Sequence, residues 1–513
     1  MCFRVNLRTP DAEGRSCTGE ILFISPLDTV RLRARKAYTH VLAYPGTDRA
    51  TQEREKYAVQ THGQSEPMTA NASSQTLYKI RKASETSLFR VLVSISAVAI
   101  ASIVAMFARE NSTLILIGCV ASASVVAIAF RFDYLHPAVV FMTPWIVILG
   151  FSTIPISKYA HPLDPRITLF ILSTISVWLL VTASAEINAG KRDANAIELG
   201  RRHEMRPIAR IRSAVSGGFL LLYVLAGLNV AHAGYVPLVS LLTTGNSGYM
   251  TFGLPTFYGA YLAFANSMAC LALYLYFTSR ERMYLILFLS VLILHVLFIT
   301  RQNIVTLLVE AFVIRSFTVR RVSRVALLSA FAVFLMFFAL LGTLRSGNIK
   351  HTIDVRGQYT WVPTVIIWLY AYSYFNVLNL ENMITRSGAP FYDGSMWRQL
   401  LPSVLRPDSV HASYLQLTSM NVTSYMYPIY FDVGDAGVKV WTFVLAAVTV
   451  FWYRRAIHRR FFSDVTIYAC LLFCAAMSFF VGFWFYLPVI FQVTFFLIFQ
   501  RTLFRPQMNG VHQ

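Results

Sequence analysis

The sequence predicts an all-α polytopic membrane protein with about 12 transmembrane helices, a re-entrant or interfacial segment and a long loop on the outer side. Of the 513 residues, 56% are hydrophobic and 14% are charged, whereas about a quarter of a soluble domain is charged. The apolar residues form runs of about 18–25 residues, which is long enough to cross a hydrocarbon core of about 30 Å. These runs are continuous rather than alternating, which excludes a transmembrane β-barrel.

The net charge of +20 follows the predicted topology. Lys and Arg gather in short loops on one side of the predicted membrane, as cytoplasmic loops do, so we expect no nucleic-acid partner. Four of the six cysteines lie inside apolar runs, and no Cys/His zinc spacing occurs. We therefore expect neither a metal site nor a bound cofactor.

Residues 1–87 are hydrophilic and contain no apolar segment of the kind that signal peptides carry. Their composition predicts a cytoplasmic tail without a packed core, largely disordered. Four basic residues before or at the start of the first apolar run place the N-terminus in the cytoplasm; they are Lys79, Arg81, Lys82 and Arg90.

Residues 88–503 form the predicted membrane domain, and residues 504–513 form a second cytoplasmic tail. The predicted spans are 88–108, 112–130, 136–155, 166–185, 213–233, 254–278, 283–300, 303–318, 325–343, 430–452, 464–482 and 484–503. The loop at 186–212 is rich in arginine and follows four crossings from an inside start, so the charge pattern and the count agree. Both termini are then cytoplasmic.

Residues 361–380 are apolar and aromatic enough to form one more span, which would put the following polar stretch inside. The span at 430–452, however, ends in the basic cluster of residues 454–460, so it must run from outside to inside. We therefore expect 361–380 to form a re-entrant or interfacial helix pair and 385–429 to be an outer loop. The alternative is that one of the shorter runs does not cross completely.

Acidic residues are nearly absent from the predicted spans, and Glu310 is the main exception. An ionisable group in hydrocarbon usually faces the protein interior, as an ion or proton site or as the partner of another charge. We favour the second interpretation, with Arg315 or Arg301 as the partner. The two halves of the chain show no repeat, which argues against an inverted-repeat transporter.

Arginines gather on the side where positive charge is disfavoured. They are Arg301, Arg345, Arg356, Arg386, Arg398 and Arg406. The planar guanidinium fork matches phosphate oxygens, so such a cluster at the membrane boundary suits a lipid carrier with a diphosphate head group. Neutralising the diphosphate would also make it a better leaving group.

Transfer of a chain to a sugar hydroxyl requires a general base. His411 is the first candidate because histidine titrates near neutrality. His351, Asp408 and Asp393 are further candidates. Asp432 is either a catalytic carboxylate or, like Asp435, a cap at the start of the next helix.

The segment NVTSYMYPIYFDVGDAG, residues 421–437, resembles the N-x-x-T/S…P-x-Y-x-D-x-G-x-x-G signature of bacterial oligosaccharide repeat-unit polymerases of the Wzy-dependent pathway. Three further stretches agree with that family in order. They are GYVPLVS (234–240) with FGLPTFYG (252–259), TRQNIVTLLVEAFVI (300–314) and LGTLRSG (341–347).

The resemblance implies a metal-independent glycosyltransferase of the bacterial inner membrane, acting on the periplasmic face. It would join undecaprenyl-diphosphate-linked oligosaccharide units into O-antigen, capsular polysaccharide or exopolysaccharide, with membrane lipid and a chain-length regulator protein as implied partners. Arg301 and Arg345 lie on matching motifs and are the implied carrier-binding residues. A flippase or other transporter, and an O-antigen ligase of the same pathway, are the alternatives.

Overall fold

The computed structural model describes most of the membrane domain and two short N-terminal segments. The described residues are 3–10, 16–23, 89, 92–93, 96, 112–130, 133–189, 208–249, 251–319, 323, 325, 329, 332, 336, 339–340, 342–343, 347–386, 388–392, 394–402, 405–406, 415–417, 420 and 423–504.

The N-terminal unit, Met1–Thr76, contains one antiparallel hairpin. Its strands are β1 (Phe3–Pro10) and β2 (Ser16–Phe23), and Phe3 pairs with Phe23. This hairpin is the described part of the tail for which we predicted disorder, and the other residues of 1–76 lie outside the described ranges.

In the second unit, Leu77–Gln513, the regular secondary structure of the described residues is helical, and one isolated bridge joins Ser157 and Val355. Its α-helices are α4 (Ser112–Ala129), α5 (Pro137–Ser152), α6 (Pro165–Ala189), α7 (Ile208–Ala233), α8 (Pro237–Thr244), α9 (Phe257–Ser279), α10 (Arg282–Leu297), α11 (Arg301–Thr318), α13 (Ile349–Thr352), α14 (Thr364–Arg386), α15 (Met426–His458), α16 (Phe462–Ala476) and α17 (Leu487–Leu503). Three short 3₁₀ helices are η2 (Gly357–Tyr359), η3 (Ser395–Leu400) and η6 (Phe483–Phe485).

Four described helical segments are long and apolar enough to cross a membrane by length and composition. They are Pro165–Ala185, Arg210–Thr244, Phe257–Ser279 and Met426–His458. Five shorter apolar helices accompany them within the described part of the chain. The all-helical membrane fold is thus confirmed in this coarser form, while the number of crossings stays a prediction.

The helix ends follow local sequence signals. The ring nitrogen Nδ1 of His136 accepts from the backbone N–H of Ala138 and caps α5, whose first residue is a proline. Asp164 accepts from the N–H of Arg166 in the same way at the start of α6. At the end of α9, Arg280 adopts the left-handed conformation (φ 64°) that commonly terminates a helix.

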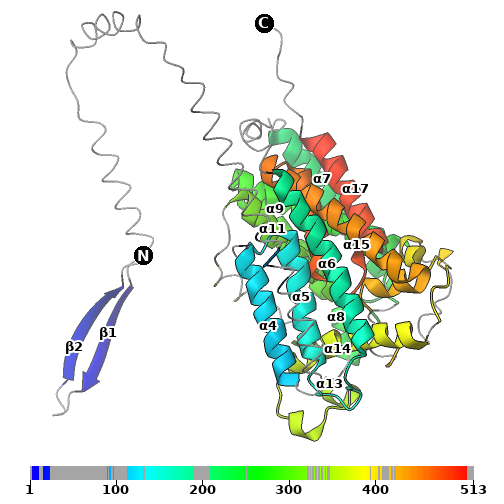
Figure 1. Cartoon of the computed structure of the whole chain (residues 1–513). Coiled ribbons are helices and arrows are strands. Elements are labelled where there is room, and N and C mark those ends of the chain that lie inside the picture. The colour runs from blue at the N-terminus through cyan, green and yellow to red at the C-terminus, as the bar shows by residue number, and fades with distance from the viewer. Residues whose placement is uncertain are drawn as a thin grey trace, which may run out of the picture. The chain divides into compact units, whose positions relative to one another are not determined.

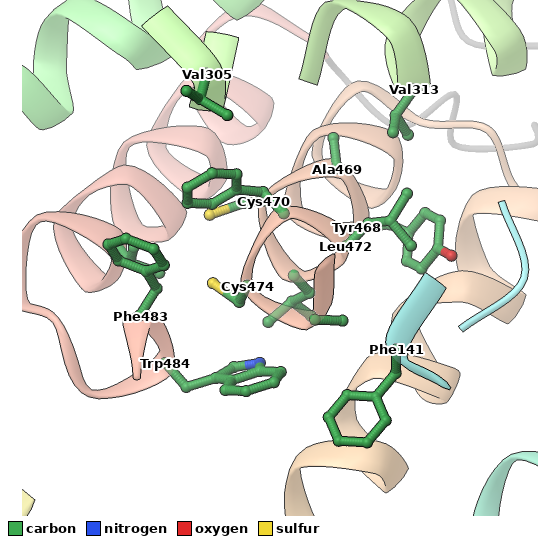
Figure 2. Packing of buried hydrophobic residues seen from close by; sticks show 14 of the residues in the cluster. Phe141, Val305, Val313, Tyr468, Ala469, Cys470, Leu472, Cys474, Phe483 and Trp484 are labelled. Carbon is green, nitrogen blue, oxygen red and sulfur yellow. The ribbon is translucent and has the colours of Figure 1, made fainter. Parts of the chain in front are cut away.

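Helix α16 packs at the centre of the bundle, because its side chains are buried from Phe462 to Ala475. A helix that is apolar on every side is stable only when other elements surround it. Figure 2 shows Cys470 and Cys474 of α16 among Val305 from α11 and Phe483 from the turn before α17.

The described connections fall into two sets at alternate ends of the helices, which we call the basic end and the loop end. The basic end comprises residues 130, 133–136, 280–281 and 459–461; the loop end comprises 153–164, 234–249, 251–256, 298–300, 347–363, 388–392, 394–402, 405–406, 415–417, 420, 423–424 and 477–486. At the basic end, the hydroxyl of Tyr453 donates to Asp133 (3.2 Å). At the loop end, Arg356 donates to the carbonyl of Ser157 (3.1 Å). These sets match the two sides that the charge pattern predicts, and in that prediction the loop end is the outer one.

Helix α14 corrects one expectation. We predicted a re-entrant or interfacial helix pair at residues 361–380, and the structure has in place of a pair a single continuous helix from Thr364 to Arg386. Most of its residues are buried, including Asn376, Asn379 and Asn382. It is not among the four candidate spans, and Figure 1 places it with α13 at one end of the bundle.

The division into two ends predicts which residues face each side of the membrane. In Trp361→Cys the new thiol lies at the loop end, where the native side chain is 77% exposed. In Ser279→Cys it lies on an exposed position at the basic end. We expect a membrane-impermeant maleimide added to intact cells to label the first variant, and to label the second only after permeabilisation. Equal labelling of both variants in intact cells would contradict the predicted sidedness.

Candidate functional site at the loop end

The backbone is strained immediately before Arg301, the first residue of α11. Ile299 has φ 55° and is 3% exposed. A β-branched residue rarely adopts this conformation, which costs about 1–3 kcal/mol and occurs preferentially at functional sites. Two backbone bonds hold the turn, from Thr300 N–H to the His295 carbonyl and from Arg301 N–H to the Ile299 carbonyl (3.0 Å each).

A chain of buried side-chain hydrogen bonds supports this turn. His295 is 1% exposed; its Nε2 bonds Asn266 Oδ1 and its Nδ1 bonds the Thr300 hydroxyl (2.9 Å each). The amide of Asn266 in turn donates to Asn303 Oδ1 (3.0 Å). Because Asn266 Oδ1 can only accept, Nε2 is the donor of that bond, while the Thr300 hydroxyl beside Nδ1 also donates to the His295 carbonyl (3.2 Å). The network fixes the start of α11 against α9, and hence the position of Arg301.

The guanidinium of Arg301 hydrogen-bonds Tyr372 of α14. Tyr372 also contacts the ring of Phe480 (centroids 5.0 Å apart) and stacks on Trp368 (5.5 Å). Arg301 is therefore half-buried in an aromatic setting at the loop end, where a guanidinium is less hydrated and binds an anion more strongly than it would in water.

Arg356 lies on a different side of α14. Its Nε donates to the Ser157 carbonyl and its Nη2 to the Ala160 carbonyl (3.1 Å each). Its charge also acts on Tyr370 and Tyr374. On a helix with 100° per residue, these two tyrosines lie on the face opposite Tyr372.

Arg301 and Arg356 therefore interact with tyrosines on opposite faces of α14 and do not form one clamp. Arg356 instead joins the loop 153–164 to residues 353–357, because its guanidinium bonds two backbone carbonyls of that loop. Burial raises the pKa of Tyr374 to about 12, so its hydroxyl stays protonated and donates to the Tyr159 carbonyl (3.0 Å).

Arg398 and Arg406 belong to a third group, around η3 and the turn before α17. Arg398 lies in η3, and Arg406 donates to the Leu401 carbonyl (3.2 Å). Arg406 is exposed and close enough to Tyr486 for an electrostatic interaction. In the same region Trp397 of η3 packs edge-on against Trp441 of α15 (5.4 Å).

Asp432 is 4% exposed and holds a loop rather than the start of a helix. Its Oδ1 accepts from the Gly394 N–H (2.8 Å) and its carbonyl accepts from the Tyr392 N–H (3.0 Å). The expectation that Asp432 caps a helix is wrong, because α15 already begins at Met426. The helical path breaks at Gly434 (φ 71°, ψ −168°), so Asp435 is the residue that starts the second half of α15.

Several predicted site residues lie outside the described residues: Arg345, Asp393, Asp408 and His411. Their roles stay predictions. His351, the second candidate base, lies exposed in α13 at the loop end.

A histidine–carboxylate pair at the loop end was not found from the sequence. His161 Nε2 lies 3.1 Å from Glu381 Oε2, and its Nδ1 lies 3.2 Å from the Tyr159 carbonyl. Glu381 also accepts from the Asp164 N–H (2.8 Å). Because its two ring nitrogens face the Glu381 carboxylate and the Tyr159 carbonyl, His161 ties the loop 153–164 to α14. In the sequence, Glu381 is visible only as a single carboxylate in α14. Its pairing with His161 is apparent only from the structure.

Glu310 is fully buried in the bundle, and its partners differ from those we expected. Its Oε1 accepts from the Gln492 amide (2.6 Å) and its Oε2 accepts from the Cys270 thiol (3.0 Å). The predicted pairing with Arg315 or Arg301 is wrong. Neutral donors from α9 and α17 hold the carboxyl group, so it connects three helices.

Among the described residues, no group of three or more His, Cys, Asp or Glu side chains is arranged to hold a metal ion. Comparison of the chain with models of protein families, with curated proteins and with solved structures finds no match.

The hydrogen-bond chain that supports Arg301 predicts that Asn266→Leu strongly lowers the stability of the folded protein. The change leaves the Nε2–H of His295 and the Oδ1 of Asn303 without this partner. Each buried group left in this way lowers the free energy of unfolding by about 1–3 kcal/mol. We expect the thermal unfolding midpoint of the purified protein to fall by about 5 °C or more. Ser267→Ala is the matched control, since Ser267 bonds only its own helix through the Ala263 carbonyl. Equal midpoints for the two variants would contradict the proposed role of the network.

The neutral partners of Glu310 predict that Glu310→Gln is tolerated and Glu310→Leu is not. Glutamine keeps an acceptor oxygen at similar volume, whereas leucine leaves the Gln492 amide and the Cys270 thiol without an acceptor, at about 1–3 kcal/mol each. Unfolding midpoints of the two variants provide the measurement. A charged Glu310 held by an arginine would instead make both substitutions equally damaging.

Proposed function

We propose that this chain is a glycosyltransferase of the bacterial inner membrane that polymerises undecaprenyl-diphosphate-linked oligosaccharide repeat units on the periplasmic face. The observation that carries the proposal is Arg301, which a strained turn and a buried network hold at the loop end beside Tyr372. A guanidinium at the membrane boundary is suited to a lipid diphosphate, which is anchored at that depth by its own tail.

The reaction moves the growing chain from its carrier to a new unit. A hydroxyl of the new unit attacks the anomeric carbon of the growing chain, a C–O bond forms, and the bond to the diphosphate breaks. The diphosphate leaves with the electron pair, and the proton of the hydroxyl passes to a general base. Arg301, with Arg345 from the matching motif, would stabilise the charge that develops on the leaving group.

His411 and Asp408 are the first candidates for the base in this proposal. Asp432 is a weaker candidate, because one of its carboxylate oxygens already accepts from the Gly394 N–H. Arg398 and Arg406 lie farther along the loop end, around η3, where they would bind the oligosaccharide or the second carrier rather than the same diphosphate as Arg301.

A flippase or other transporter for the same lipid-linked unit is the second candidate. The buried carboxyl of Glu310 favours it, since ionisable groups within spans often belong to transport pathways. Deletion of the gene and gel analysis of the surface polysaccharide distinguish the two. Loss of long ladders with single repeats retained supports the polymerase, whereas loss of all repeats supports a flippase or a ligase.

The polymerase proposal predicts that Arg301→Ala and Arg345→Ala abolish the long ladders while the protein remains in the membrane. Arg301→Lys should retain a small part of the activity, because it keeps the charge but not the planar fork. Arg280→Ala, at the exposed basic end, is the matched control and should give normal ladders. Complementation of the deletion strain provides the readout, and normal ladders from Arg301→Ala would overturn the assignment of Arg301.

A further inference from the structure

Two tyrosine hydroxyls near the start of α9 are buried without a hydrogen-bond partner among the described residues. They belong to Tyr258 and Tyr261. Tyr261 is 3% exposed, and the two rings stack with their centroids 6.0 Å apart. A buried polar group left unpaired costs about 1–3 kcal/mol, so native proteins rarely keep one without a reason such as a ligand.

The hydrogen bond between Asn266 and Asn303 fixes the depth of these tyrosines relative to Arg301. Helices α9 and α11 both run from the loop end towards the basic end. At 1.5 Å per residue, Arg301 lies about 3 Å on the loop-end side of this bond, and Tyr261 and Tyr258 lie about 7.5 and 12 Å on the same side. Both tyrosines therefore lie farther than Arg301 towards the predicted outer surface.

The loop before α9 holds Tyr258 rigidly. Gly253 has φ 91°, and a Cβ added there would come within 2.7 Å of the Tyr258 ring and 2.9 Å of Asn229 Oδ1. The same Asn229 oxygen accepts from the Leu254 N–H (2.9 Å). Phe252 packs edge-on against Tyr258 (5.4 Å). These contacts restrict the movement of the ring on the side of the loop.

Other neighbours of the pair are also suited to a polar ligand. Tyr486 lies within electrostatic range of Tyr258, and Arg406 lies within range of Tyr486. Together with Arg301, the described part of the loop end thus offers two unpaired phenols, a third tyrosine and a second, exposed cation. Phenol hydroxyls bond sugar hydroxyls, and aromatic faces pack against sugar C–H groups.

We propose that Tyr258 and Tyr261 form a saccharide subsite that reads the hydroxyl groups of the sugar next to the diphosphate. This inference depends on the proposed function, in which Arg301 binds the diphosphate of the same lipid. The sugar adjoins the diphosphate on the water side, which is the side on which both tyrosines lie. The subsite makes the site selective for a glycosylated carrier over the bare lipid diphosphate.

The test measures binding to the purified full-length protein in lipid nanodiscs. The probes are bare undecaprenyl diphosphate, three carriers bearing a single glucose, galactose or N-acetylglucosamine, and inorganic diphosphate. We expect the wild type to bind at least one glycosylated carrier about three- to tenfold more tightly than the bare carrier, and inorganic diphosphate far more weakly. Tyr261→Phe should remove most of this preference and leave the affinity for the bare carrier unchanged.

Tyr274→Phe is the matched control, because Tyr274 lies on the same helix but at the basic end, where it donates to the Arg460 carbonyl. It should keep the preference for the glycosylated carrier. Tyr261→Phe should also keep or raise the thermal unfolding midpoint, because the change removes a buried hydroxyl that has no partner. A loss of preference accompanied by unfolding would assign Tyr261 a merely structural role and overturn the subsite.

The outcomes separate this inference from the proposed function. If all carriers bind equally tightly in the wild type and in Tyr261→Phe, the subsite is overturned while the diphosphate site of Arg301 stands. If no carrier binds, or if Arg301→Ala leaves every affinity unchanged, the proposed function fails and the subsite with it. Equal affinity for inorganic diphosphate and for the carriers would identify a free anion as the ligand and overturn both.

Discussion

The buried hydrogen-bond chain from Thr300 through His295 and Asn266 to Asn303 is the constraint on which the loop end depends. Polar groups within a membrane bundle must find partners inside the protein, because lipid offers none. Once every member is satisfied, such a network is rigid and specifies one arrangement. Here it fixes α9 against α11 and stabilises a turn at Ile299 that would otherwise be unfavourable.

Helix α14 is the second organising element, because it supplies bonding groups in several directions. Tyr374 and Glu381 hold the loop 153–164, and Asn379 bonds the backbone of Gln416 and Met420. Tyr372 contacts Arg301 on another face. A helix with so many buried polar residues is expensive to place in lipid, which accounts for its position among the loops rather than along the bundle.

Much of the fold could be predicted from the sequence, because long apolar runs and clustered arginines are local signals. The bounds of α7, α9 and α11 lie within a few residues of the predicted spans. The position of Arg301 at a helix start was also predictable. The partners of Glu310 and Arg356 were not, since Gln492 and Ser157 are distant in the chain and ordinary in type. For the same reason the arginines looked like one cluster, whereas the structure divides them around α14.

The most direct test of the account is polymerisation by the purified protein in proteoliposomes supplied only with the lipid-linked repeat unit of its own cell. The account predicts products of many repeat lengths and release of one carrier diphosphate for each bond formed, both abolished in Arg301→Ala. Movement of the lipid-linked unit across the bilayer with no change in its length would contradict the central claim.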